Sequence, residues 1–166
     1  IEEREAMLAI WEKVTFLIFG LYRMDSRFRV GDYVRTARKI SKNKISFEDG
    51  MEEIRRISDK FTIDGAISKI LGENWYGSYD NDVKYLLYRY EEYLCEKNHE
   101  SITTDLWEKI WSESPAKTIE HIHPQTYTDT WKGKIGTNQE EIETTVHTIG
   151  NLVLLPPGIN SSAGQK

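Results

Sequence analysis

Apolar residues in the first part of the chain recur at helical spacing. From Glu2 to about Leu21 they repeat every three or four positions, which predicts an amphipathic helix with a wide buried face. The same spacing predicts a second helix over 28–40. Ser46-Phe47-Glu48-Asp49 matches a capping box, so a third helix should begin there. A fourth is predicted over 59–71, with Gly72 placed to end it. The inward face of the second helix is predicted to consist of Val30, Tyr33, Val34, Ala37 and Ile40.

The strongest helical pattern lies in the middle of the chain, over 82–97. It follows a predicted loop, 73–81, that holds Trp75 and Tyr76. Four tyrosines in or beside its apolar face stand at helical spacing, which favours packing in a core and at its rim over a platform for stacking bases. They are Tyr85, Tyr88, Tyr90 and Tyr93. A shorter apolar cluster over 106–111, closed by Ser114-Pro115, predicts one more helix.

After Pro115 the pattern changes to short extended segments. Residues 118–123 suit a strand that Pro124 ends, and 152–155 form a second short apolar strand. Between them we expect a polar loop around 131–136 and a helix over 137–148. A final helix should begin near Asn160. This change predicts a boundary between a helical support region, residues 1–114, and a distinct unit, residues 115–166.

Length and composition indicate a cytoplasmic, soluble protein. The 166 residues contain no apolar run of about 18 residues and no basic start leading into an apolar signal core, so we expect no membrane segment. The single cysteine, Cys95, excludes an internal disulfide framework and a zinc site built from paired Cys-x-x-Cys knuckles. The absence of an initiating Met indicates a piece of a longer protein.

The net charge of −5 is unevenly distributed along the chain. Residues 1–44 carry +4, residues 45–100 carry −6 and residues 101–166 carry −3. The overall sign argues weakly against binding to nucleic acid, because phosphate contacts need Lys and Arg. Residues 23–44 nevertheless form a basic patch, which fits a solvated helix face and a phosphate-contacting surface equally well. Its candidate nucleic-acid-binding residues are Arg35, Arg38, Lys39, Lys42 and Lys44.

The residue types with the clearest chemistry lie around the two predicted strands. Side chains alternate across a strand, so Glu120 and His121 point to opposite faces unless the strand ends there, and Pro124 favours such an end. A neutral imidazole, with an ordinary pKa of about 6.5, can take a proton from water near neutral pH. Glu120 and Asn160 offer the hard oxygen ligands that Mg2+ or Mn2+ prefers. His121 is therefore the candidate general base and the other two are candidate metal ligands.

Three segments together resemble the HNH, or His-Me finger, nuclease motif, specifically the C-terminal nuclease domain of GmrSD-type restriction endonucleases. They are Glu-His-Ile-His-Pro-Gln at 120–125, Gly-Asn-Leu-Val-Leu-Leu at 150–155, and Asn160 with Lys166. Residues 85–94 also resemble the helix that precedes the motif in that family. The resemblance implies a mainly α fold, a helical bundle support followed by a C-terminal ββα-metal unit.

The same resemblance implies a role for each motif residue. His121 is then the general base, and Glu120 and Asn160 hold the ion. Asn151 corresponds to the middle catalytic residue of the motif, and its side-chain amide braces the loop that holds the base. Lys166 falls where a phosphate-contacting or structural lysine is expected. The resemblance also implies a preceding ParB-like sensor domain, missing here, and defence against phage DNA carrying modified bases or backbones.

Several alternatives remain open at this point. His121 also fits a core histidine, and Glu120 also fits a residue that caps a neighbouring element. His123 fits packing behind the site, a phosphate contact or a second ligand, and His147 fits a place facing the same site. A zinc site made of His121, His123 and His147 is a rival, although it leaves Asn151 and Asn160 without a role. We therefore predict a metal-dependent DNA endonuclease, with a non-catalytic DNA-binding or regulatory module of the same fold as the alternative.

Overall fold

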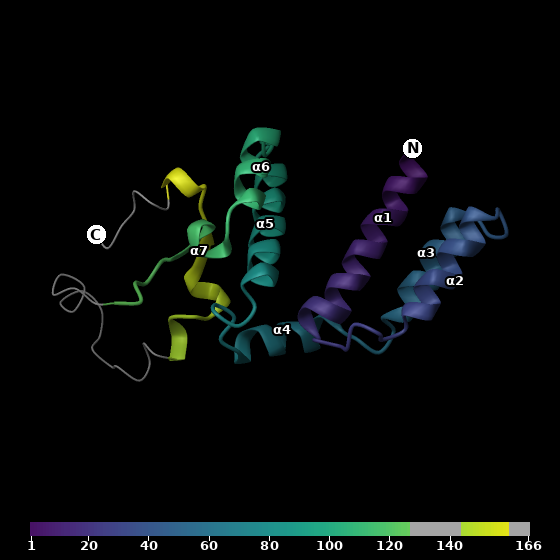
Figure 1. The fold of residues 1–166 in the computed structure, drawn as a ribbon, viewed down its shortest axis with the longest axis horizontal. Helices are drawn as coiled ribbons and strands as arrows, with labels where there is room; N and C mark the ends of the chain where they lie inside the picture. The colour runs from purple at the N-terminus through teal and green to yellow at the C-terminus, as the bar shows by residue number, and fades with distance from the viewer. Residues whose placement is uncertain (127–143, 160–166) are drawn as a thin grey trace. The chain divides into compact units, whose positions relative to one another are not determined.

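The structure, a computed structural model, describes residues 1–126 and 144–159 (Figure 1). The chain divides into two compact units, Ile1–Gly72 and Glu73–Lys166, called below the N-terminal unit and the C-terminal unit. The predicted boundary at 114/115, between a helical support region and a nuclease motif, is a different division from this one and stays a prediction.

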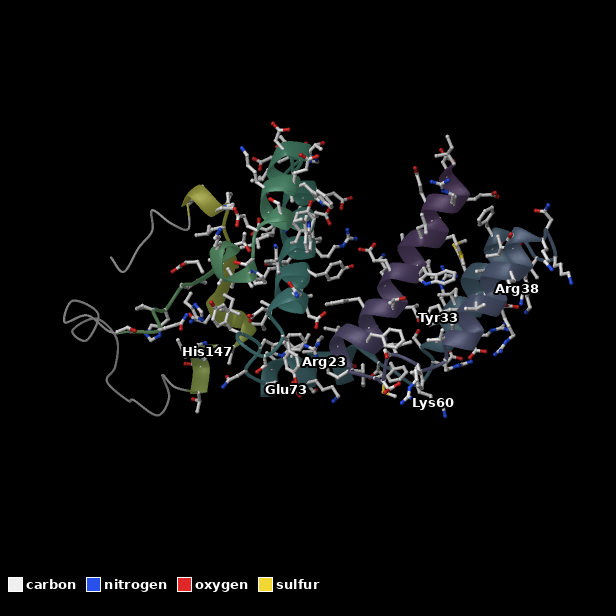
Figure 2. The ribbon with its side chains drawn as sticks, in the orientation of Figure 1. Arg23, Tyr33, Arg38, Lys60, Glu73 and His147 are labelled. Carbon is white, nitrogen blue, oxygen red and sulfur yellow. The ribbon has the colours of Figure 1, made fainter. Side chains whose placement is uncertain are left out.

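The N-terminal unit is entirely helical, and α1, α2 and α3 lie side by side (Figure 1). Its core consists of apolar side chains from these helices and from the turn after α1. Tyr33 is buried there with its ring centroid 5.3 Å from that of Trp11 (labelled Tyr33 in Figure 2). The elements are α1 (Glu2–Thr15), the π-helix η1 (Phe16–Leu21), α2 (Val30–Ser41), α3 (Phe47–Ile57) and α4 (Ile63–Gly72).

Side-chain caps mark the starts of two helices, α3 where it was predicted and α4 later than predicted. At α3 the Ser46 hydroxyl accepts a hydrogen bond from the Asp49 amide at 3.0 Å, and the Asp49 carboxylate accepts from the Ser46 amide, which completes the capping box. The helix predicted from residue 59 begins only at Ile63. Thr62 accepts a hydrogen bond from the Gly65 amide just before it, so the cap fixes the later start.

The predicted inward face of α2 is wrong in part. Tyr33 is buried and Ile40 packs against the core, but Val30 and Val34 are 42% and 51% exposed, and Ala37 is exposed too. Thr36 is buried instead, because its hydroxyl donates a 2.8 Å hydrogen bond to Glu53 on α3. That hydrogen bond offsets the free-energy cost of burying a hydroxyl group. The spacing of apolar residues cannot predict such a bond, because it involves polar side chains on two helices.

The C-terminal unit combines helices with one small sheet. Its long helix runs over the predicted residues and starts slightly earlier, at Asp80. Tyr88 is buried on it, whereas Tyr90 and Tyr93 are exposed and stacked with ring centroids 6.2 Å apart. The elements are α5 (Asp80–Lys97), α6 (Thr104–Ser112), α7 (Pro115–Thr118), β1 (Ile119–His121), the 3-10 helix η2 (Ile149–Asn151) and β2 (Leu152–Leu154).

Strands β1 and β2 pair antiparallel, with Glu120 opposite Val153 and His121 opposite Leu152. The second strand is confirmed, but the first is shorter at both ends than the predicted 118–123. Pro115 stands in the first turn of α7, where its missing N–H costs nothing, and that helical turn takes in Thr118. The predicted loop around 131–136, most of the predicted 137–148 helix and Asn160 lie outside the described residues. Residues 157–159 are helical, so the final helix starts slightly earlier than predicted.

The mainly helical fold class is thus confirmed, whereas the ββα-metal arrangement is not established by the elements described. Among the described helices, none is both long enough and apolar enough to cross a membrane.

Candidate functional site

His121 lies at the end of β1 with its side chain only 8% exposed. Its Nε2 is 3.2 Å from Nδ1 of His147, and its Nδ1 is 3.0 Å from the side-chain nitrogen of Gln125. The Tyr76 ring meets the imidazole edge to face, with centroids 4.5 Å apart. The predicted base and the predicted neighbour His147 are therefore brought together, and both nitrogens of the His121 ring have partners.

Burial and the neighbouring His147 lower the pKa of His121 to about 4. Burial is the larger cause, because a charged imidazole loses its hydration there. At neutral pH the ring is consequently uncharged, which is the form that accepts a proton.

Glu120 occupies the opposite face of β1 and is half-buried. The pKa of the Tyr76 hydroxyl is raised by burial first, and then by the negative charges of Asp80 and Glu120. Glu120 thus acts electrostatically on the tyrosine that packs against His121, although its side chain leaves the strand on the other side.

Asn151 fastens the chain that follows His121. Its side-chain oxygen accepts a 2.8 Å hydrogen bond from the His123 amide, and its side-chain nitrogen donates to the carbonyls of His123 at 3.0 Å and Val146 at 2.8 Å. The Ile122 amide donates to the Asn151 carbonyl at 2.9 Å as well. One amide therefore joins the segment after β1 to the segment that carries His147.

No group of three or more His, Cys, Asp or Glu side chains suited to a metal ion occurs within residues 1–126 and 144–159. This finding argues against the zinc site of His121, His123 and His147, all three of which are described. Glu120 supplies one hard oxygen donor that suits Mg2+ or Mn2+. Asn160, the second predicted ligand, and Lys166 lie outside the described residues.

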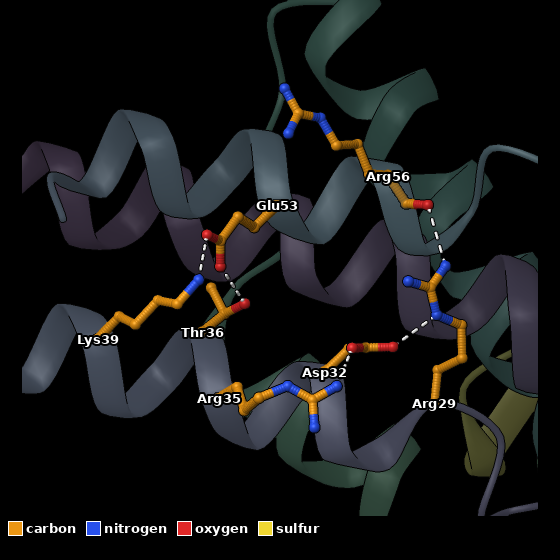
Figure 3. Close-up of a pocket in the computed structure, with 7 residues that line it drawn as sticks. All are labelled: Arg29, Asp32, Arg35, Thr36, Lys39, Glu53 and Arg56. Carbon is orange, nitrogen blue, oxygen red and sulfur yellow. Dashed lines mark hydrogen bonds and ion pairs between the residues drawn. The ribbon is translucent and has the colours of Figure 1, made fainter.

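The predicted basic residues divide into two groups. A hollow of about 210 Å3 lies between α2 and α3, called below the α2–α3 cleft (Figure 3). Its four cations and two carboxylates leave a net charge of +2. Its lining residues are Arg29, Asp32, Arg35, Thr36, Lys39, Glu53 and Arg56.

Ion pairs hold the charges of the α2–α3 cleft in place. Asp32 bonds both Arg29 and Arg35, and Lys39 lies 2.6 Å from Glu53 (Figure 3). The remaining predicted residues, Arg38, Lys42 and Lys44, are exposed, and no ion pair involves them in the part of the chain that the structure describes. These three cations are open to an external phosphate, whereas a phosphate in the cleft must compete with Asp32 and Glu53.

Two residues around His121 were not predicted to take part in the site. Gln125 was inside the quoted motif but carried no role, and Tyr76 was assigned only to a loop. The Trp75 and Tyr76 amides both donate to the His147 carbonyl, at 3.1 and 3.3 Å. Periodicity could not reveal that contact, because it joins segments far apart in the sequence.

With this geometry described, the comparison with known families gives the class of the protein, that of restriction endonucleases. Residues 63–166, more than half of the chain, match the family described as GmrSD restriction endonucleases, C-terminal domain. The chain belongs to this family. The match takes in α4 and the C-terminal unit, and residues 1–62 lie outside it. No curated protein and no solved structure gives a match.

Proposed function

We propose that the C-terminal unit is the catalytic part of an HNH-type DNA endonuclease that depends on Mg2+ or Mn2+. The observation that carries the proposal is the buried, uncharged His121, braced through Asn151, within a family of restriction endonucleases. The substrate is a DNA phosphodiester. Phage or modified DNA, and a ParB-like sensor domain in the intact protein, belong to the proposal through the family alone.

His121 takes a proton from the water that attacks phosphorus. A general base must be unprotonated and close to that water, and the lowered pKa of His121 keeps its ring unprotonated well below neutral pH. Asn151 keeps the segment after His121 in register with β2, and this fixes the position of the His121 imidazole. His123 contributes its main chain to this brace.

Glu120 and Asn160 would hold the ion, Glu120 from the strand face opposite His121. When bound, a divalent ion neutralises charge on the phosphoryl oxygens and the leaving oxygen. Lys166 would contact phosphate. The exposed Arg38, Lys42 and Lys44, with Arg35 and Lys39 at the α2–α3 cleft, would hold the DNA backbone.

Cleavage of supercoiled plasmid by the whole chain, with Mg2+, Mn2+ or EDTA, tests this function. We expect metal-dependent nicking that His121→Ala lowers by roughly 100-fold or more, the usual contribution of a positioned base, while DNA affinity stays unchanged. His99→Ala, at an exposed histidine, is the matched control. Cleavage that persists in EDTA or in His121→Ala would refute the proposal. Binding of DNA without cleavage would favour the non-catalytic module.

A further inference from the structure

The hydrogen bonds around His121 fix which of its nitrogens carries the proton. An amide nitrogen only donates, so the side-chain nitrogen of Gln125 must donate to Nδ1 of His121. A neutral imidazole has one N–H, which therefore lies on Nε2. Nε2 then donates to Nδ1 of His147, 3.2 Å away. Both hydrogen bonds agree on one tautomer.

His147 is itself held firmly enough to impose that choice. Its carbonyl accepts from the amides of Trp75 and Tyr76, and Trp75 is fully buried. Its ring lies nearly parallel to the Tyr76 ring, with an interplanar angle of 13° and centroids 5.6 Å apart. The 75–76 segment thus fixes both the main chain and the ring plane of His147 (labelled in Figure 2).

Tyr76 contacts the two imidazoles at once. It meets His121 edge to face and stacks on His147, so the three rings form one cluster. Gln125, in contrast, is exposed, and its amide can leave Nδ1 of His121 without opening the core. The Nε2 side of His121 is therefore the fixed side, and the Nδ1 side is the one a water can reach.

We infer that His147 is a positioning residue: it accepts the Nε2 proton of His121 and so leaves Nδ1 of His121 as the proton acceptor, with Tyr76 holding both rings. The catalytic consequence rests on the proposed function, whereas the tautomer itself does not. Which nitrogen of an imidazole works is set by the hydrogen bond that the other makes.

Three substitutions at one position test this role. Asn places its side-chain oxygen near the position of Nδ1 in His, so His147→Asn retains the acceptor, whereas His147→Gln displaces it and His147→Ala removes it. We expect kcat for plasmid nicking to fall roughly 10- to 100-fold in the Ala and Gln variants, with little change in KM, as for other partners that orient a working imidazole. His147→Asn should restore most of the loss, an outcome that a purely structural histidine would not give. Equal activity in all three variants, or failure of Asn to exceed Ala, would overturn the inference.

A second measurement does not depend on cleavage. In EDTA, nitrogen-15 NMR of the His121 ring should show the Nε2–H tautomer in the wild type and in His147→Asn, and a mixture of tautomers in His147→Ala. A wild-type ring protonated on Nδ1, or a ring indifferent to His147→Ala, would refute the role of His147. If the folded wild type shows the Nε2–H tautomer but does not cleave DNA, the proposed function fails and the assignment of the hydrogen bond stands.

Tyr76 is tested in the same spectra. Tyr76→Phe keeps the ring and should leave the tautomer unchanged, whereas Tyr76→Ala should broaden the His121 and His147 signals. Unaltered signals in Tyr76→Ala would remove Tyr76 from the inference.

Discussion

The two units bury different kinds of side chain. The buried core of the N-terminal unit consists of apolar side chains and Tyr33, and Thr36 is its one buried polar residue among those described. The C-terminal unit buries Lys84, Thr118 and His121 as well as apolar residues. Burying a polar group costs free energy unless a hydrogen-bond partner compensates for the lost hydration. Among the described residues, the buried lysine and the buried histidine, Lys84 and His121, both belong to the C-terminal unit.

Lys84 illustrates the cost in the C-terminal unit. Its Nζ donates a 2.6 Å hydrogen bond to the Glu113 carbonyl and lies 5.1 Å from the centre of the Trp111 ring. Burial lowers the pKa of this lysine, and the Glu113 carboxylate opposes the shift. Lys84 on α5 thus links this helix to the end of α6 through a hydrogen bond from a buried charged group.

The largest effect is expected where the C-terminal unit relies on one apolar side chain. Trp75 is fully buried and its amide donates to the His147 carbonyl, so Trp75→Ala should lower the free energy of unfolding by about 3–5 kcal/mol. Urea denaturation followed by circular dichroism measures the loss. Trp107→Ala, at a site 46% exposed in the same unit, is the control and should cost much less. Equal losses would mean that burial does not set the stability of this unit.

The next effect is a pH dependence that the buried imidazole of His121 gives to the C-terminal unit. The pKa of His121 is about 4 in the folded chain and about 6.5 when unfolded, so the unfolded chain binds the extra proton between these values. Its contribution to stability is present above pH 6.5, falls as the pH drops to 4, and amounts to about 3 kcal/mol at most. Urea denaturation in EDTA across this range should show the loss in wild type and much less of it in His121→Asn. Identical pH profiles would contradict the assignment.

A smaller loss is expected from the brace around His123. Asn151→Ala removes three side-chain hydrogen bonds from half-buried groups and should cost about 2 kcal/mol. Asn151→Asp keeps the acceptor for the His123 amide but loses both donated bonds, so its loss should be intermediate. Thermal unfolding measures both variants, and a stability of Asn151→Ala within 0.5 kcal/mol of wild type, on the order of a surface change, would show that the brace is dispensable.

The smallest effect on stability is expected at the surface of the N-terminal unit. Lys42→Ala with Lys44→Ala should change the free energy of unfolding by less than about 0.5 kcal/mol, because both side chains are exposed. If they contact phosphate, DNA affinity should fall and the slope of log affinity against log salt should drop by about 2. The control pair Lys13→Ala with Lys60→Ala, also exposed in this unit, should leave the slope unchanged. An unchanged slope in the first pair would identify the patch as a solvated face.

Local signals were sufficient where a single segment determines its own structure. The 82–97 helix and the capping box at Ser46 were predicted within a few residues, because periodicity and caps are local. The motif at 120–125 and 150–155 identified the family. The predictions failed where contacts between distant segments determine which side chain is buried. Thr36 is buried because its hydroxyl donates a hydrogen bond to Glu53 on another helix.

The candidate site shows the same limit. A place facing the same site as His121 was one open alternative for His147, and the structure brings the two rings together. Nothing in the spacing indicated that Tyr76 would lie against both rings, since its contacts depend on hydrogen bonds from its own segment to His147. Sequence patterns selected these two histidines as candidates, while the orientation of their rings depends on tertiary contacts.

The pairing of β1 with β2 has a consequence for how the chain tolerates change in length. His121 and Leu152 are cross-strand partners, with residues 122–151 between them. The entropy of closing a flexible loop grows only logarithmically, by about 0.6 kcal/mol for each doubling of length. A flexible insertion into this connection would therefore add little to the cost of folding, provided that the contacts of Asn151 and His147 are kept. The imidazole and its partners can stay in register while the connecting sequence lengthens, shortens or accepts an inserted domain.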